Sequence, residues 1–124
     1  MSFVHKDLAE GRWKTFSFLE QMANVGSEVE RTMSRNREDR ADMAQKAFER
    51  ALELLDLTIQ DPKNRSRLSE LCRLREVLVD YFMYSNQYKS SDKLWHNYFY
   101  AFAYAAQMQR HRKDLIQSDQ IGLI

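Results

Sequence analysis

Residues that interrupt helices are scarce in this chain, which has 3 Gly and 1 Pro among 124 residues. These two residues are the least compatible with a helix interior, so the composition predicts an all-α protein. There is a single cysteine, Cys72, so no internal disulfide can form. Unpaired cysteine is typical of reducing compartments, and the cytoplasm is therefore the expected location.

Long apolar runs are also missing. No stretch is long enough to span a membrane, and residues 1–12 lack the core of a signal peptide, so no membrane association is expected. The 19 basic and 18 acidic side chains give a net charge of +1, which carries no overall signature of nucleic-acid binding. The length suits one domain with a modest core, and we expect a single domain over 1–124.

The patterns that would indicate a metal site or an active site are absent from the sequence. A bundle with a di-iron centre needs Glu-x-x-His pairs, and the chain has none. His5, His96 and His111 are dispersed, and none is placed on a predicted core face. There is no phosphate-binding glycine loop, and Cys72 is predicted to be an inert core residue. We therefore expect no metal and no cofactor, and we assign no catalytic residue.

What the sequence does contain is amphipathic helices. Apolar residues recur at helical spacing over residues 7–33, 41–60, 63–84 and 93–113. The connection over 34–40 has no apolar residue, although helical extension also fits it because no Gly or Pro interrupts it. Short connections predict a four-helix bundle in up-down-up-down antiparallel order. The tail over 114–124 is expected to dock weakly or to fray.

Arg75 is the residue that departs from its local pattern. It falls in the middle of the predicted apolar face of its helix, one turn from Leu71 and from Val79. A buried arginine is costly unless it is paired, and Glu30 is the best candidate partner. Either this pair fixes the register of the helices, or Arg75 meets an anionic ligand. Gly26, on the apolar face of the first helix, predicts close approach of another helix.

Three aromatic residues are predicted to face outward. Tyr100 and Tyr104 are one turn apart on the polar side of their helix, and Trp13 projects near the start of the first helix, where it is expected either to cap the bundle or to contact another chain. Adjacent exposed aromatic residues favour an interface between copies of the chain. A stacking platform for bases or a partner protein, and no role at all, are the alternatives.

A local basic cluster surrounds the first connection. Arg31, Arg35, Arg37 and Arg40 alternate with Glu38 and Asp39. A solvated turn held by ion pairs is the leading interpretation, and an edge that contacts phosphate groups is the alternative.

Residues 9–31 carry one resemblance to a known family. AEGRWKTFSFLEQMANVGSEVER resembles a conserved region of the four-helix-bundle proteins encoded in 23S rRNA intervening sequences. Relatives of those proteins are accessory factors beside reverse transcriptases in diversity-generating retroelements. The resemblance implies an oligomeric bundle with RNA or DNA as a partner. The matching residues are Ala9, Glu10, Gly11, Phe18, Leu19, Gly26, Ser27 and Glu30.

Residues 75–81 carry a second resemblance. REVLVDY is similar to the R-x-x-L-V-H-x-Y stretch of HEPN helical proteins, in which the arginine and histidine form an RNase site. Arg75, Leu78 and Val79 match, but Asp80 occupies the position of the histidine. The resemblance thus implies a relative that lacks the acid–base group of the nuclease.

Taken together, these features predict a non-enzymatic, self-associating helical bundle that acts as a binding or scaffold component. RNA or DNA is the candidate specific ligand. The alternatives are an RNase that uses Arg75 with Asp80 or His96, and the protein-binding member of a toxin–antitoxin or nucleotidyltransferase pair.

Overall fold

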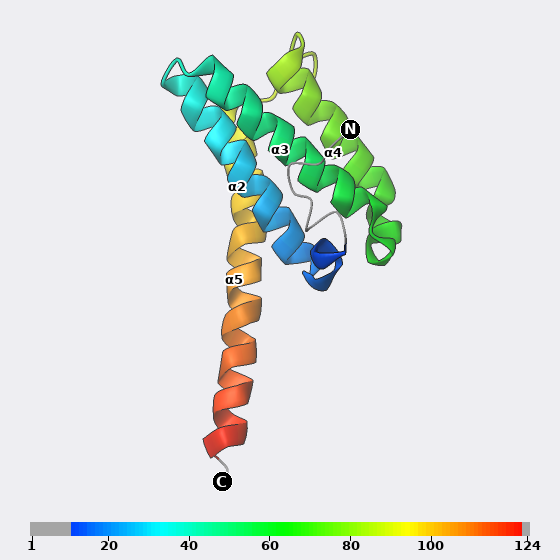
Figure 1. The fold of residues 1–124 in the computed structure, drawn as a ribbon, viewed down its shortest axis with the longest axis vertical. Helices are drawn as coiled ribbons and strands as arrows, with labels where there is room; N and C mark the ends of the chain where they lie inside the picture. The colour runs from blue at the N-terminus through cyan, green and yellow to red at the C-terminus, as the bar shows by residue number, and fades with distance from the viewer. Residues whose placement is uncertain (1–10, 123–124) are drawn as a thin grey trace.

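The computed structural model describes residues 11–122, with side-chain surroundings through residue 117. Four helices run up, down, up and down, as predicted, and together form a bundle (Figure 1). No strand occurs in this part of the chain. The helices are α2 (Phe18–Arg37), α3 (Ala41–Gln60), α4 (Leu68–Met83) and α5 (Asp92–Gly122), and two short 3-10 helices, η1 (Arg12–Thr15) and η2 (Pro62–Arg67), precede α2 and α4.

The first long helix begins later than the predicted start at residue 7. Ser17 is its N-cap: the Ser17 hydroxyl accepts the backbone N–H of Glu20, and the Glu20 carboxylate accepts that of Ser17. Such a reciprocal pair satisfies two backbone donors and fixes a helix start. Before it, Gly11 has a φ of 125°, which a helix cannot contain. Residues 7–10, at the start of the predicted helix, lie outside the described residues.

The first helix also ends later than predicted. It continues from the predicted end at residue 33 through Arg37, so most of the predicted connection over 34–40 is helical extension. Asp39, with a φ of 58°, reverses the chain directly before α3. The limits of α3 are those predicted.

The third predicted helix, 63–84, is divided. Asp61 accepts the backbone N–H of Lys63 and starts a 3-10 helix with Pro62 in its first turn. The regular helix follows only from Leu68 to Met83.

The last helix is longer than the predicted 93–113. It includes most of the predicted tail and ends at Gly122, a length of 31 residues. At 1.5 Å per residue it is about 46 Å long, against about 30 Å for α2. Its C-terminal part therefore projects beyond the lower end of the bundle (Figure 1). Among residues 11–122, no helix combines the length and apolar character needed to cross a membrane.

The core is organised around α2, which packs against both α3 and α5. Gly26 makes the second contact close: a Cβ built on it would lie 2.7 Å from Cβ of Phe99. The predicted close approach of another helix to Gly26 is confirmed. The core faces predicted for α3 and α5 are buried or half-buried, and the largest fully buried apolar side chains are Met22, Met33, Leu55, Leu71, Leu78, Val25 and Val29.

Trp13 corrects the prediction of an outward-facing residue. It is 2% exposed, and its indole N–H donates to Thr58 Oγ1 of α3 at 3.0 Å. Trp13 belongs to η1, which is separate from α2 because α2 begins only at Phe18. Trp13 can therefore be buried in the core instead of continuing the face of α2. It is therefore unavailable as an interface residue.

Below Trp13 lies a buried polar network that joins η1, α2, α3 and η2. Gln21 Nε2 donates to Asp61 Oδ2 at 2.8 Å and to the carbonyl of Trp13 at 3.1 Å. Asn64 Nδ2 donates to Gln21 Oε1 at 2.8 Å and to the carbonyl of Thr58 at 2.9 Å. Because the buried groups are matched with partners, the network specifies how the lower end of the bundle is assembled.

Burial alone would raise the pKa of Asp61, but hydrogen bonds from Lys63 and Gln21 outweigh it and lower that pKa below its ordinary value of 3.8. The ionised carboxylate is therefore the form that stabilises the fold.

We predict that substitution of Gly26 by Ala destabilises the bundle. Helix propensity alone would stabilise the variant by about 1 kcal/mol. Overpacking typically costs about 1–3 kcal/mol, and Cβ of Phe99 cannot swing away as the end of a flexible side chain could. Urea titration should give a lower free energy of unfolding for Gly26→Ala, and no loss for Ser27→Ala at the exposed next position. A more stable Gly26→Ala would mean that the close approach is absent.

We predict a pH-dependent contribution from Asp61. Because its pKa is lowered by folding, its stabilisation is complete above the ordinary pKa and is lost as the pH falls below about 4. The variant Asp61→Asn should be less stable at pH 7 by about 1–3 kcal/mol and should depend less on pH in the acid range.

Urea titrations at several pH values measure both effects. Asp114→Asn, at an exposed position of α5, is the matched control and should change the free energy of unfolding at pH 7 by less than about 0.5 kcal/mol. An Asp61→Asn variant with the wild-type stability and acid dependence would contradict the assignment.

Candidate functional site

Arg75 does not pair with Glu30. Its Nε donates to Asp56 Oδ1 of α3 at 2.7 Å, and both side chains are about 40% exposed. Glu30 instead lies 2.6 Å from His96 Nδ1 of α5. The predicted pair is thus wrong, because α4 is rotated relative to the predicted face and carries Arg75 to the rim of the bundle.

The rotation of α4 is visible in its buried residues. Leu71, Leu74 and Leu78 are buried, whereas Leu68 and Cys72, both predicted to be in the core, are exposed. Leu74 replaces Cys72 on the inner face because a helix with apolar residues on a wide arc can be buried along either edge of that arc. Cys72 is therefore not the core cysteine that was predicted.

An open pocket of about 590 Å³ adjoins Arg75 on the outer side of α4. Asp80, one of two acids that line the pocket, is 8% exposed and accepts the backbone N–H groups of Gln87 at 3.0 Å and Tyr88 at 3.1 Å. Both carboxylate oxygens are thus engaged in holding the loop after α4. The pocket is lined by Cys72, Arg75, Glu76, Val79, Asp80, Tyr84, Ser85, Gln87 and Tyr88.

His96 lies in a different pocket. With Glu30 it lines a small pocket of about 150 Å³ between α2 and α5, beside Gly26 and Tyr100. Of the residues named for an RNase, Arg75 and Asp80 therefore line the same pocket, whereas His96 lies in another. No group of three metal-binding side chains occurs in the part of the chain that the structure describes.

The four arginines of the predicted phosphate-contacting edge each have an acidic partner. Two of them share one acid, since Arg35 and Arg40 both lie 3.6 Å from Glu38. Arg31 pairs with Glu28, one turn earlier in α2, at 2.8 Å, and Arg37 pairs with Asp92 at the start of α5 at 3.2 Å. This agrees with a surface held by ion pairs.

α5 has two apolar faces. The first packs on the bundle and consists of Trp95, Phe99, Ala106 and the half-buried Tyr98 and Phe102. Burial raises the pKa of Tyr98 to about 12. This face ends where Ser17 Oγ of the α2 cap donates to Gln109 Oε1 at 3.0 Å. Residues 111–117 are all exposed.

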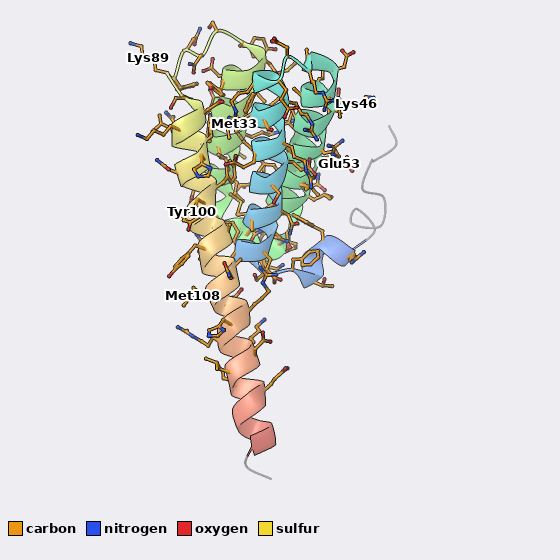
Figure 2. The ribbon with its side chains drawn as sticks, turned by 90° about the vertical axis from the view of Figure 1, so that its left-hand side faces the viewer. Met33, Lys46, Glu53, Lys89, Tyr100 and Met108 are labelled. Carbon is orange, nitrogen blue, oxygen red and sulfur yellow. The ribbon has the colours of Figure 1, made fainter. Side chains whose placement is uncertain are left out.

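The second face of α5 is exposed along its whole described length. Apolar residues recur every seven positions at Leu94, Ala101, Met108 and Leu115, and three residues fall between them in the manner of a coiled-coil seam. In Figure 2, Tyr100 and Met108 lie on the side of α5 away from the other helices. The α5 seam is defined as Leu94, Asn97, Ala101, Tyr104, Met108, His111 and Leu115, all of them exposed.

Aromatic rings follow the edge of the α5 seam. The rings of His96 and Tyr100 are stacked with centroids 6.0 Å apart, and those of Tyr100 and Tyr104 with centroids 6.4 Å apart. Tyr100 is 60% and Tyr104 is 56% exposed, so both lie outward as predicted. The sequence analysis missed Met108 and Leu115, and the seven-residue spacing is the signal that would have identified them.

A comparison of the chain with models of known protein families, with curated proteins and with solved structures found no match. The resemblances to the intervening-sequence proteins and to HEPN proteins therefore stay predictions.

We predict that Arg75→Ala and Arg75→Met both fold. An ion pair exposed to this degree is worth about 0–1 kcal/mol, so the loss in the free energy of unfolding should not exceed that range. Arg50→Met provides the contrast, because Arg50 pairs at 3.2 Å with Glu28, whose side chain is only 9% exposed. Thermal unfolding should give a clearly larger loss for Arg50→Met. Failure of both Arg75 variants to fold would restore a structural role for that residue.

Proposed function

We propose that this protein is a non-enzymatic, self-associating helical bundle, and that α5 carries the surface through which it associates. The observation that supports this most directly is the α5 seam, a continuous row of exposed side chains of which five are apolar or aromatic. Large exposed apolar side chains in one row are typical of an interaction site rather than of ordinary surface.

The projection of α5 supports the same proposal. Beyond Gln109, as far as residue 117, no side of the helix is buried in the bundle: Ile116, which continues the inner side, is 52% exposed, and Leu115 continues the outer row that includes Met108. A helix of this length gains most of its stability from packing of an apolar face. A contact outside the bundle would supply that packing.

A binding or scaffold role is favoured over catalysis by the arrangement of the polar residues. Arg75 and Asp80 line one pocket, but Arg75 is paired with Asp56 and both carboxylate oxygens of Asp80 hold a loop, while His96 is paired with Glu30 in a separate pocket. General acid–base catalysis needs such groups together on one substrate. RNA cleavage by the wild type that Arg75→Ala abolishes would support the RNase alternative instead.

RNA or DNA as a partner stays a prediction. The four arginines of the first connection are engaged by acids, which lowers their availability to phosphate groups. The stacked rings of Tyr100 and Tyr104 are compatible with base stacking, but Tyr104 belongs to the α5 seam and Tyr100 borders it, where self-association would use them.

We predict that Met108→Lys weakens self-association. The wild-type mass measured by light scattering should rise with protein concentration, because association follows mass action. An unpaired charge in an apolar contact is costly, so the variant should dissociate at concentrations at least about tenfold higher, which corresponds to 1.4 kcal/mol.

Gln45→Lys is the matched control, since it adds the same charge at an exposed position of α3. It should associate as the wild type does. A wild type that stays monomeric over the whole concentration range would overturn the proposed function.

A further inference from the structure

We infer that the partner of the α5 seam is the same seam of a second copy, aligned parallel and in register. This inference rests on the proposed function and adds to it the identity and the direction of the partner. In coiled-coil terms, Leu94, Ala101, Met108 and Leu115 occupy the a positions, and Asn97, Tyr104 and His111 occupy the d positions.

The distribution of polar residues decides the direction. Every a position is apolar, whereas two of the three d positions, Asn97 and His111, are polar. Parallel helices pair a with a and d with d, so each of these polar side chains faces its own copy and can share a hydrogen bond with it. Antiparallel helices pair a with d, so Asn97 and His111 would each face an apolar residue in any register. Burial of a polar group without a partner is costly, and the parallel arrangement avoids it.

The residues that flank the seam do not oppose a parallel arrangement. In a parallel pair, residues at g positions lie beside residues at the e positions five places later in the partner. Gln107 would thus lie beside Arg112, and Tyr100 beside Ala105, so neither pairing brings like charges together.

The bundle leaves the α5 seam accessible along its length. Phe99 and Ala106, which face α2 and the core, are on the opposite side of α5 from Ala101 and Met108. The two bundles of a pair would therefore lie on the outer sides of the two α5 helices, with the seam between them. Pairing of the two α5 helices also brings their projecting parts, residues 111–117, into contact with each other.

The length of the α5 seam determines how strongly two copies are expected to associate. It covers three heptads from Leu94 to Leu115, about 32 Å of helix, which is the shortest repeat that indicates a coiled coil. Two of its seven layers are polar and one is alanine. The pair is thus a reversible, concentration-dependent dimer rather than an obligate one.

Disulfide cross-linking tests the direction. The exposed Cys72 is first replaced by Ser, and single cysteines are then introduced as Leu94→Cys (an a position) or His111→Cys (a d position) in two full-length chains of different size tags. The two proteins are mixed and oxidised, and the products are separated by mass. Parallel pairing aligns each cysteine with its own kind, so disulfides should join 94 to 94 and 111 to 111, and mixed products should be rare. Ala103→Cys, exposed on the other side of α5, should cross-link much more slowly.

Each of the other possible results would contradict one identifiable part of the proposal. Mixed products that join 94 to 111 would show an antiparallel pair and overturn the direction, while self-association itself would stand. Association in light scattering without a disulfide at either position, or with cross-linking no faster than that of Ala103→Cys, would overturn the α5 seam as the contact. A protein that never associates would overturn the proposed function as well.

Discussion

The contact between Gly26 of α2 and Phe99 of α5 determines which side of the last helix is buried. Because Gly26 has no side chain, the two backbones come close enough for Trp95, Phe99 and Ala106 to enter the core. Once that side is fixed, the side opposite to it must face outward. The exposure of the α5 seam therefore follows from packing inside the bundle.

Two kinds of polar interaction connect the other segments of the bundle, and they differ in how much they contribute to its stability. The network of Gln21, Asp61 and Asn64 is buried and joins residues 40 and 43 positions apart in the sequence. Its removal would leave donors and acceptors without partners, which is costly. The pair of Arg75 with Asp56 is half-exposed and is worth little. The side chain that seemed most unusual in the sequence is thus among the less important for the fold.

The sequence was sufficient to predict those features of the fold that depend on local pattern. The limits of α3 were predicted to the residue because the connection before it has no apolar residue and Pro62 follows its end. The face of α4 was wrong, because its apolar residues cover an arc too wide for periodicity to choose Leu74 over Cys72. The position of Trp13 depends on a contact with Thr58, forty-five residues away, and no local signal contains it. The seam was available in the sequence as a seven-residue spacing, but a search for a single buried face per helix overlooks it.

The central claim is that the outer side of α5 is covered when the protein associates. Hydrogen exchange of the backbone amides of residues 111–117, measured over a series of protein concentrations, tests it most directly. These residues are exposed and lie outside the bundle, so the claim predicts that their exchange slows as the concentration rises, while exchange in α3 stays constant. Rapid exchange of these amides at every concentration would contradict it.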